Sequence, residues 1–448
     1  MTWVEEEFET VDLGDKRLND RLILLAARLS ESPTASIPGA CSGWAEVQGA
    51  YRFLAQEDVG WEDILTPHFA CSMRRMAQHQ VVLCIQDTTE LDFNGQQIEG
   101  LGSLTYDAQR GMYLHPTYAV SVDREPLGIL DAWMWARPVR DKGGSPEPSI
   151  KESQRWTEGY ARLAEVAGSL PDTRLVYVAD READIVELMR KAQELGNPLD
   201  WLIRSQHNRA LPSGEKLWQS VKENAPAGEI QFTLPSRKAK KGQKAQKARI
   251  VRQQVRFCSV KVSDGRKGHV DACCVIASEV DAPPGVQPIE WRLLTNRKVE
   301  DFDNASELID WYRARWEIEM FFHVLKTGCR VEALQLSTID RVERALAIFM
   351  VVAWRISHLM RLGRSCPDLD AELFFDREEW QAAYLMMKRP FPKQTPRLNE
   401  VIRLVAMVGG FLGRKGDGEP GAKTIWQGLQ RVMDCAQGIR WTRENEVV

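Results

Sequence analysis

The stretch VVLCIQD, residues 81–87, is a short continuous apolar run that ends in an aspartate. A second run of this kind, LVYVAD, occupies residues 175–180 and also ends in an aspartate. Runs of this length are typical of strands buried on both faces, as in the parallel part of an α/β sheet. We therefore expect two core strands, each followed by a carboxylate.

Asp87 and Asp180 admit two interpretations. Side chains that follow strands of an open sheet lie at the edge where ligands commonly bind. An aspartate in such a position also often caps the next helix or turn. For either residue taken alone, the capping interpretation is the stronger one.

The elements around these runs predict an α/β fold with helical regions at both ends. Periodicity and turn residues divide the chain into domains over 1–65, 66–362 and 363–448, the first and third helical. The elements expected inside the middle domain are strands over 113–122 and 127–135, helices over 153–166 and 183–195, a β insertion over about 200–300, and a helix from about 303.

Composition excludes several classes of protein. The chain has 448 residues, of which 44% are hydrophobic and 27% charged, so it is long enough for several domains with real cores. Its longest apolar run, residues 345–354, is too short to cross a membrane, and the acidic N-terminus lacks the pattern of a signal peptide. Nine scattered cysteines without a CxxC motif fit a reducing cytoplasm.

Basic residues gather in one part of the chain. Residues 201–260 carry thirteen Lys and Arg against three Asp and Glu, although the whole chain has a net charge of −4. The densest part includes Lys238, Lys240, Lys241 and Lys244. Such a run suits contacts with DNA phosphates, and it equally suits a solvated loop between two strands. The aromatic residues nearby, Trp201, Trp218, Phe232 and Phe257, are expected in the strand core.

A third carboxylate lies in a predicted helix over residues 311–328. Tyr312, Arg315, Glu319 and Lys326 fall within roughly 60° of one another on an ideal helix. One interpretation is an exposed face with ion pairs such as Arg315–Glu319. The other is a metal-binding carboxylate flanked by cations and a phenol that hold phosphates.

Three carboxylates from distant parts of the chain suit two Mg²⁺ ions, with Mn²⁺ as a substitute, because hard cations prefer oxygen ligands. Two such ions about 3.5–4 Å apart support phosphoryl transfer. The sequence has no histidine pair at ligand spacing, so His115 and His323 are candidates only for the neighbourhood of the site. Without a GxxxxGK[ST] motif, no nucleotide cofactor is expected.

These motifs resemble those of the cut-and-paste DDE transposases of bacterial insertion sequences, the insertion-sequence-four family that includes the transposon-five transposase. The spacing of residues 312–326 matches the family signature Y-(2)-R-(3)-E-(6)-K, and DTT at 87–89 and DREAD at 180–184 match its two Asp blocks. The resemblance extends to the ends of the chain. The segments that carry it there are WRLLT at 291–295, LGDKR at 13–17, GAYRF at 49–53, GGF at 409–411 and Trp426.

The resemblance implies an RNase H-like catalytic core with a β insertion. It implies that Asp87, Asp180 and Glu319 bind the metal ions, and that Trp291 stacks on a flipped base. DNA contacts are then expected from Tyr312, Arg315, Lys326, Arg181, Arg204, the four lysines of the basic run, Arg17 and Arg52. The N-terminal domain would bind DNA and the C-terminal domain would dimerise.

The implied activity is cut-and-paste transposition: nicking at the transposon end, formation and opening of a hairpin, and strand transfer into target DNA. The expected partners are the terminal inverted repeats, the target DNA and a second copy of the chain, in a bacterial cytoplasm and without a membrane. Two alternatives remain open at this point. One is a catalytically retired DNA-binding remnant or inhibitor, and the other is a metal-dependent nuclease without strand transfer.

Overall fold

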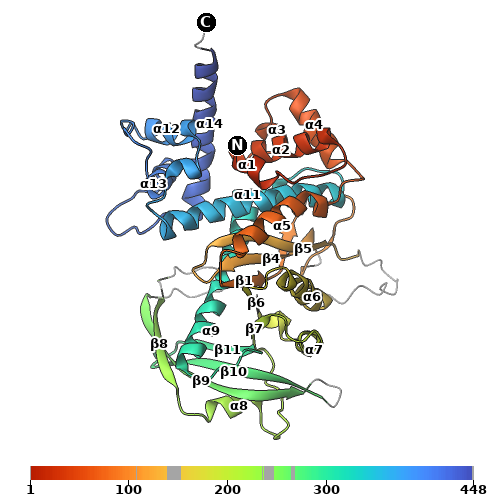
Figure 1. Ribbon diagram of the computed structural model, residues 1–448, viewed down its shortest axis with the longest axis vertical. Helices are drawn as coiled ribbons and strands as arrows, with labels where there is room; N and C mark the ends of the chain where they lie inside the picture. Colours follow the sequence, from red (N-terminus) through yellow and green to blue (C-terminus); the bar gives the residue numbers. More distant parts are fainter. Residues whose placement is uncertain are drawn as a thin grey trace. The chain divides into compact units, whose positions relative to one another are not determined.

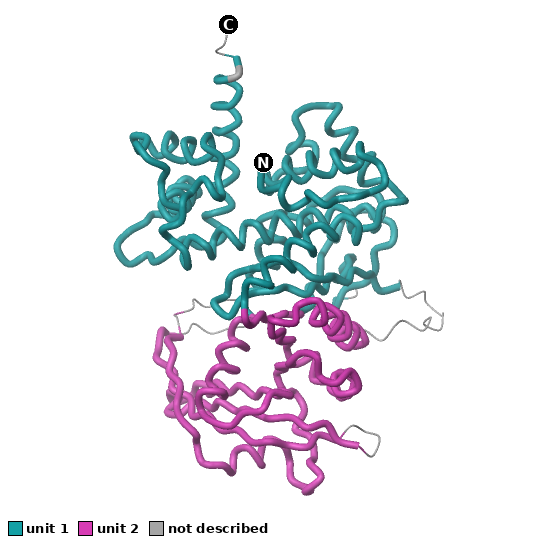
Figure 2. The backbone as a smooth tube through the Cα atoms, viewed as in Figure 1, with its two compact units in different colours: residues 1–79, 87–147, 316–448 teal, residues 80–86, 148–315 magenta. Residues whose placement is uncertain are grey.

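The computed structural model describes residues 2–106, 108–138, 153–234, 236, 247–263 and 268–445. It contains two compact units (Figures 1 and 2). Unit 1 comprises residues 1–79, 87–147 and 316–448, and unit 2 comprises residues 80–86 and 148–315. Each unit thus holds part of the predicted catalytic domain.

Unit 2 is built on a mixed sheet. In spatial order its strands are β1 (Val81–Gln86), β6 (Arg174–Ala179), β7 (Asp200–Arg204), β11 (Glu290–Thr295), β10 (His269–Val280), β9 (Arg249–Ser263) and β8 (Gly228–Leu234). The first three strands run parallel, and the other neighbours are antiparallel. The predicted α/β sheet with a β insertion is confirmed, except that a short helix, α8 (Leu217–Lys222), interrupts the insertion.

The two apolar runs form the parallel core of this sheet. All residues of β1 after Val81 and all residues of β6 after Arg174 are buried. Helix α6 (Gln154–Gly168) lies close to the end of β1, because a Cβ on Gly159 would come within 2.3 Å of the Gln86 side chain. Glycine at 159 therefore lets this helix approach the edge from which the chain leaves β1. The remaining helices of unit 2 are η1 (Arg181–Ala183), α7 (Val186–Glu194) and α9 (Phe302–Ala314).

Unit 1 begins with helices and a small antiparallel group of strands. The helices are α1 (Trp3–Glu7), α2 (Lys16–Glu31), α3 (Ile37–Ala40), α4 (Trp44–Leu54) and α5 (Trp61–Met76), and the strands are β2 (Thr89–Asp92), β3 (Gly102–Ser103), β4 (Arg110–Ser121) and β5 (Pro126–Trp135). Helix α2 starts where the Asp15 side chain accepts a hydrogen bond from the Arg17 backbone N–H at 2.8 Å, a regular N-cap. The strands predicted over 113–122 and 127–135 are β4 and β5, paired antiparallel.

Helices form the rest of unit 1. They are α10 (Trp316–His323), the π-helical turn η2 (Val324–Gly328), η3 (Val331–Ala333), α11 (Ile339–Ser365), η4 (Ala371–Leu373), α12 (Arg377–Met386), α13 (Leu398–Val408) and α14 (Ala422–Asn445). Helix α11 is long and apolar enough to cross a membrane by composition, but 94% of its most apolar window is buried inside the protein. It packs against α5, β5, α13 and α14, which makes it the central core helix of unit 1.

The predicted domain borders fall inside two of these helices. Residue 65 lies within α5 and residue 362 within α11. Both helices are continuous across the border because their apolar faces belong to the core of unit 1. The division into 1–65, 66–362 and 363–448 stays a prediction from the sequence.

Candidate active site

The carboxyl ends of β1 and β6 lie side by side. Gln86 and Ala179 are register partners, and the next residues along the chain are Asp87 and Asp180. Both aspartates are partly exposed. Asp180 also caps the 3₁₀ helix η1, because its Oδ1 accepts a hydrogen bond from the Glu182 N–H at 2.7 Å. The capping interpretation is therefore correct for one oxygen of Asp180, and it leaves the other oxygen for a ligand.

Tyr312 lies within electrostatic range of Asp180 and of two arginines in unit 2. Tyr312 lies on α9 and is only 7% exposed. Burial raises the pKa of its phenol, the guanidinium groups of Arg315 and Arg204 oppose that rise, and the Asp180 carboxylate adds to it. These four side chains thus lie within electrostatic range of one another. Arg204 is the last residue of β7 and is exposed, so the end of this strand supplies a cation to the group.

The prediction of one continuous helix over 311–328 is wrong. Helix α9 ends at Ala314, Arg315 is a turn residue that caps it, and α10 begins at Trp316. The π-helical turn η2 then holds Lys326. The 100° spacing of an uninterrupted α-helix therefore does not describe the whole stretch. Glu319 is partly exposed on α10. Turns of the π type occur often at functional sites.

Lys326 is anchored within unit 1. Its ammonium donates a hydrogen bond to the backbone carbonyl of Glu90 at 2.7 Å and lies 3.2 Å from the Glu332 carboxylate. Glu332 in turn accepts a hydrogen bond from the Asp92 N–H at 3.0 Å. Lys326 is therefore positioned by β2 and η3, and it remains partly exposed.

His115 lies closer to the predicted site than its sequence pattern indicates. It is 1% exposed on β4, and its Nδ1 lies 2.9 Å from the hydroxyl of Thr88, the residue after Asp87. The only available sequence signal was a histidine inside an otherwise apolar strand. Its partner could not be identified without the pairing of the strands.

Two other carboxylates of the DREAD block have structural partners. Glu182 lies 3.3 Å from the Arg155 guanidinium. Asp184 is buried, pairs with Arg209 at 2.6 Å, and accepts hydrogen bonds from the backbone N–H groups of Gln206 and His207. Both acids thus form ion pairs with arginines of unit 2.

Trp291 forms an aromatic stack in the β insertion. Its ring lies on Phe232 of β8, with 5.4 Å between ring centroids and 12° between planes. The Arg313 guanidinium lies 5.4 Å from the centroid of the Phe232 ring. Phe232 is therefore not simply a core residue, as the sequence suggested. It is partly exposed and covers one face of Trp291.

The basic run of the insertion lies outside the described residues at Lys238, Lys240, Lys241 and Lys244. The arginines that flank it on β9 are paired with acids of the neighbouring strand. Arg249 pairs with Glu279, and Arg252 with Asp281. These two arginines thus contribute to the hairpin itself, whereas Lys247, which is also described, is exposed.

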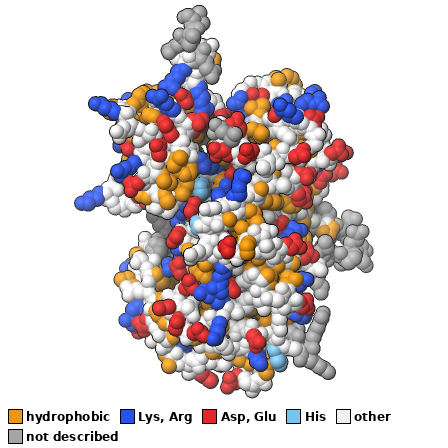
Figure 3. Space-filling model, viewed as in Figure 1, with side chains coloured by type: hydrophobic (Ala, Val, Ile, Leu, Met, Phe, Trp, Pro, Cys, Tyr) orange, Lys and Arg blue, Asp and Glu red, His pale blue; other side chains and the backbone are white. Residues whose placement is uncertain are grey.

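Exposed arginines also occur on the N-terminal helices. Arg17 is exposed and forms an ion pair with Asp15 at 2.8 Å, and Arg52 is exposed in the last turn of α4. The space-filling view shows both acidic and basic side chains over these helices (Figure 3). The exposed Arg181 begins η1 in unit 2.

The predicted metal ligands fit a hard divalent cation by their chemistry, because all three are carboxylates. Oδ1 of Asp87 accepts a hydrogen bond from the Thr88 N–H at 2.8 Å, and Oδ1 of Asp180 accepts one from the Glu182 N–H at 2.7 Å. The described residues contain no preformed cluster of three or more His, Cys, Asp or Glu side chains suited to a metal. Asp180 belongs to unit 2, whereas Asp87 and Glu319 belong to unit 1, so the complete triad stays a prediction.

Three family models match consecutive parts of the chain. The "Transposase DNA-binding" model matches residues 1–59, the "Transposase DDE domain" model residues 160–354, and the "Transposase Tn5 dimerisation domain" model residues 351–447. The DDE domain match fits an RNase H-like core, in agreement with the mixed sheet of unit 2.

A cryo-EM structure described as a piggyBac transposase synaptic complex with hairpin DNA matches 99% of this chain and 80% of that chain. The TM-score is 0.39 and the sequence identity 8%, so this likeness carries no argument of its own. The three family models match in the order DNA-binding, DDE and dimerisation regions. By these matches the chain belongs to the Tn5-like DDE transposases.

Proposed function

We propose that this transposase cuts and joins DNA at one site formed by Asp87, Asp180 and Glu319. The observation that carries the proposal is the register of β1 and β6, since each of these paired strand ends is followed by an aspartate. The group of Tyr312, Arg315 and Arg204 around Asp180 adds the cations and the phenol that a phosphodiester requires.

The three carboxylates would hold two Mg²⁺ ions, or Mn²⁺ in their place. Bound divalent ions would supply activation of the attacking oxygen and stabilisation of the leaving one. The Glu182 N–H fixes the Asp180 carboxylate through Oδ1, so that Oδ2 is presented in one orientation. Arg315 and Arg204 would neutralise the charge of the scissile phosphate, and the Tyr312 phenol would donate a hydrogen bond to it.

The reaction sequence consists of in-line displacements at phosphorus. In the first, water attacks at the transposon end, the P–O3′ bond breaks, and a 3′-hydroxyl is released. That hydroxyl attacks the opposite strand, forms a hairpin and releases the flanking DNA. A second water opens the hairpin, and the restored 3′-hydroxyl attacks a target phosphodiester. Each step exchanges one P–O bond for another, and the proton of each attacking group passes to solvent.

Trp291 would receive a base that leaves the stack at the hairpin. A hairpin bends the backbone sharply, and extrusion of one base relieves that strain. Phe232 covers one face of Trp291, so the other face is the one on which a base would stack. Lys326, anchored on the Glu90 carbonyl, would contact a phosphate near the cut.

The DNA partners in this proposal are the terminal inverted repeats and the target DNA. A homodimer that bridges two transposon ends holds them. Arg17, Arg52 and Arg181 are exposed and would contact the duplex backbone. The basic run at 238–244 would extend that contact. We place the protein in a bacterial cytoplasm, associated with the nucleoid when it is bound to DNA.

The proposal is tested by cleavage of a plasmid that carries the native flanks of the gene. Asp87→Ala, Asp180→Asn and Glu319→Gln should each lower the nicking rate at least about 100-fold, since even outer-shell changes at metal sites cost 10–100-fold. A chelator should have the same effect. Glu182→Gln is the matched control, because this exposed acid lies two residues from Asp180 and pairs with Arg155.

Three outcomes would contradict the proposal. If the wild-type protein binds the flanks but does not cut them, it is a DNA-binding remnant. Cutting without hairpin or strand transfer would identify a nuclease. Undiminished cutting by Asp180→Asn or Glu319→Gln would show that the triad is assigned wrongly.

A further inference from the structure

Two adjoining hollows of unit 1 form one groove that the catalytic proposal does not use. The first, of about 480 Å³, is lined by Thr34, Thr327, Arg330, Lys423, Trp426, Gln427, Gln430, Arg431 and Asp434. The second, of about 400 Å³, is lined by residues 34–38, Tyr51, Cys329, Arg330 and residues 333–335. Thr34 and Arg330 line both hollows, so the two hollows adjoin at these residues.

Cations dominate the charged lining of the first hollow. Arg330, Lys423 and Arg431 face a single carboxylate, Asp434. The remaining polar lining consists of hydroxyl and amide groups, which donate hydrogen bonds to phosphate oxygens as readily as they do to water.

These cations differ from most arginines of the C-terminal helices. Arg440 and Arg443 pair with acids of α12. Within the described part of the chain, Arg330 and Lys423 form no ion pair, and Arg431 donates a hydrogen bond to the Val408 carbonyl at 2.8 Å. The first hollow therefore gathers three cations against one carboxylate, Asp434.

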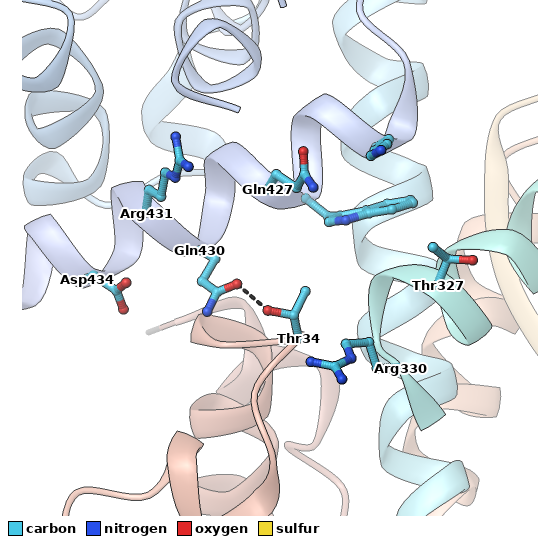
Figure 4. Close-up of a pocket in the computed structure, with 9 residues that line it drawn as sticks. Thr34, Thr327, Arg330, Gln427, Gln430, Arg431 and Asp434 are labelled. Carbon is cyan, nitrogen blue, oxygen red and sulfur yellow. Dashed lines mark hydrogen bonds between the residues drawn. The ribbon is translucent and has the colours of Figure 1, made fainter. Parts of the chain in front are cut away.

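The close-up shows how the groove is built (Figure 4). Thr34 and Gln430 meet across it, joined by a hydrogen bond from the Thr34 hydroxyl to the Gln430 side-chain carbonyl. Arg330 extends toward that pair from the segment that follows η2. Its backbone has φ 52°, a left-handed conformation that non-glycine residues adopt at a cost.

We propose that this groove holds the sugar-phosphate backbone of a DNA strand, with Arg330 at its centre. The groove joins the DNA-binding region, through Thr34 to Pro38 and Tyr51, to the segment four residues after Lys326. Two adjoining hollows offer cations and hydrogen-bond donors over a longer path than a single free phosphate needs, and that suits an extended polyanion. The inference rests on the DNA-binding character of the family and is independent of the metal-dependent chemistry proposed above.

The test is the salt dependence of binding to a fluorescein-labelled 40-base-pair duplex of mixed sequence, with the full-length protein and without divalent metal. Each lost phosphate contact makes the slope of log K against log salt concentration less steep by about 0.9. The double variant Arg330→Gln/Lys423→Gln should therefore lower the slope by about 1.8. Arg414→Gln/Lys393→Gln removes the same charges at exposed positions outside the groove and should leave the slope unchanged.

Two further measurements keep the result interpretable. Thermal unfolding of both double variants should match the wild-type protein, because the altered side chains are exposed. Arg330→Lys keeps the charge, so this variant should keep most of the wild-type slope of log K against log salt concentration. If both double variants change the slope equally, only net charge matters and the groove is not a DNA site. If the groove variants instead alter only sedimentation of the protein, the groove binds a second copy and the proposal is overturned.

Discussion

Gln86 and Ala179 are the last register partners of the parallel strands β1 and β6, and the residue after each is an aspartate. Parallel strands deliver their carboxyl ends to one edge of a sheet, so the chain continues from this edge into Asp87 and into Asp180. Gly159 allows α6 to lie on the Gln86 side chain and thereby fixes this end of β1. Two of the three proposed metal ligands thus depend on the pairing of two buried, hydrogen-bonded strands.

Tyr312→Phe should slow nicking without changing the fold. The phenol is nearly buried beside Asp180 and two guanidinium groups, and burial raises its pKa, so it stays protonated and can donate a hydrogen bond at neutral pH. A hydrogen bond to a charged group contributes about 1.5–3 kcal/mol, which corresponds to roughly 10–150-fold in rate. Single-turnover nicking of the native flanks is the measurement.

The pH profile separates this role from a structural one. Because the pKa of Tyr312 is raised, the loss in Tyr312→Phe should be the same at pH 7 and pH 9. A loss that appears only at high pH would show that the ionised phenolate acts instead. Tyr106→Phe, at a tyrosine that is 73% exposed, is the control and should leave nicking unchanged.

Phe232→Ala should affect the hairpin step more than the first nick. The Phe232 ring supports one face of Trp291, and such stacking contributes about 0.5–1.5 kcal/mol. Loss of this support should reduce the ratio of hairpin to nicked product by roughly 2–10-fold, and Trp291→Ala should reduce it further. Phe232→Tyr keeps the ring and should restore the ratio. Equal slowing of both steps by Phe232→Ala would indicate a merely structural role.

The strands of the parallel core could be predicted from sequence because their burial demands continuous apolar runs. Strands β4 and β5 were also predicted, as were the helical regions at both ends of the chain. The helix over 311–328 was predicted as continuous because a 3.6-residue period describes only an uninterrupted α-helix. The turn at Arg315 and the π-helical turn around Lys326 depend on tertiary packing and leave no periodic signal.

Side-chain partners were the least predictable part of the site. The contact of His115 with Thr88 requires residues 27 positions apart to meet through strand pairing. The stack of Phe232 on Trp291 joins β8 to β11, which are far apart along the chain. The groove around Arg330 combines three separate segments, so neither its shape nor its charge follows from any local motif.

Gly428→Ala should destabilise the C-terminal helices. A Cβ at this position of α14 would lie 1.8 Å from the Val405 carbonyl oxygen of α13, and one at Gly409 would lie 1.9 Å from the Thr424 carbonyl oxygen. The two helices are thus in backbone contact and must separate to admit a methyl group. We expect a loss of about 1–3 kcal/mol in the free energy of unfolding, measured by denaturant titration.

Gly438→Ala is the matched control on the same helix. Its Cβ would meet nothing within 4 Å, so the substitution should stabilise the helix by up to about 1 kcal/mol through propensity alone. Opposite signs for the two variants are the expected result. Equal effects would mean that the close approach of α13 and α14 does not exist in solution.

Glu343→Gln should make the protein more stable at alkaline pH. Burial raises the pKa of Glu343 to about 7 from an ordinary value of 4.5, and the nearby carboxylates of Asp340 and Glu62 add to that rise. Arg344 opposes it only partly, because its guanidinium donates hydrogen bonds to the backbone carbonyls of Val59 and Leu54.

The sign follows from proton linkage. A carboxyl group with a raised pKa in the folded state stabilises the fold below pH 4.5, and that contribution is lost as the pH rises through about 7. Glu343→Gln should therefore gain about 1–3 kcal/mol over the wild-type protein at pH 8, after allowance for solvent screening, and little at pH 5. Urea titrations at the two pH values measure this difference, with the exposed Glu57→Gln as control. A gain of the same size at both pH values would show that Glu343 is ionised throughout this range, and that its like-charged neighbours do not control its titration.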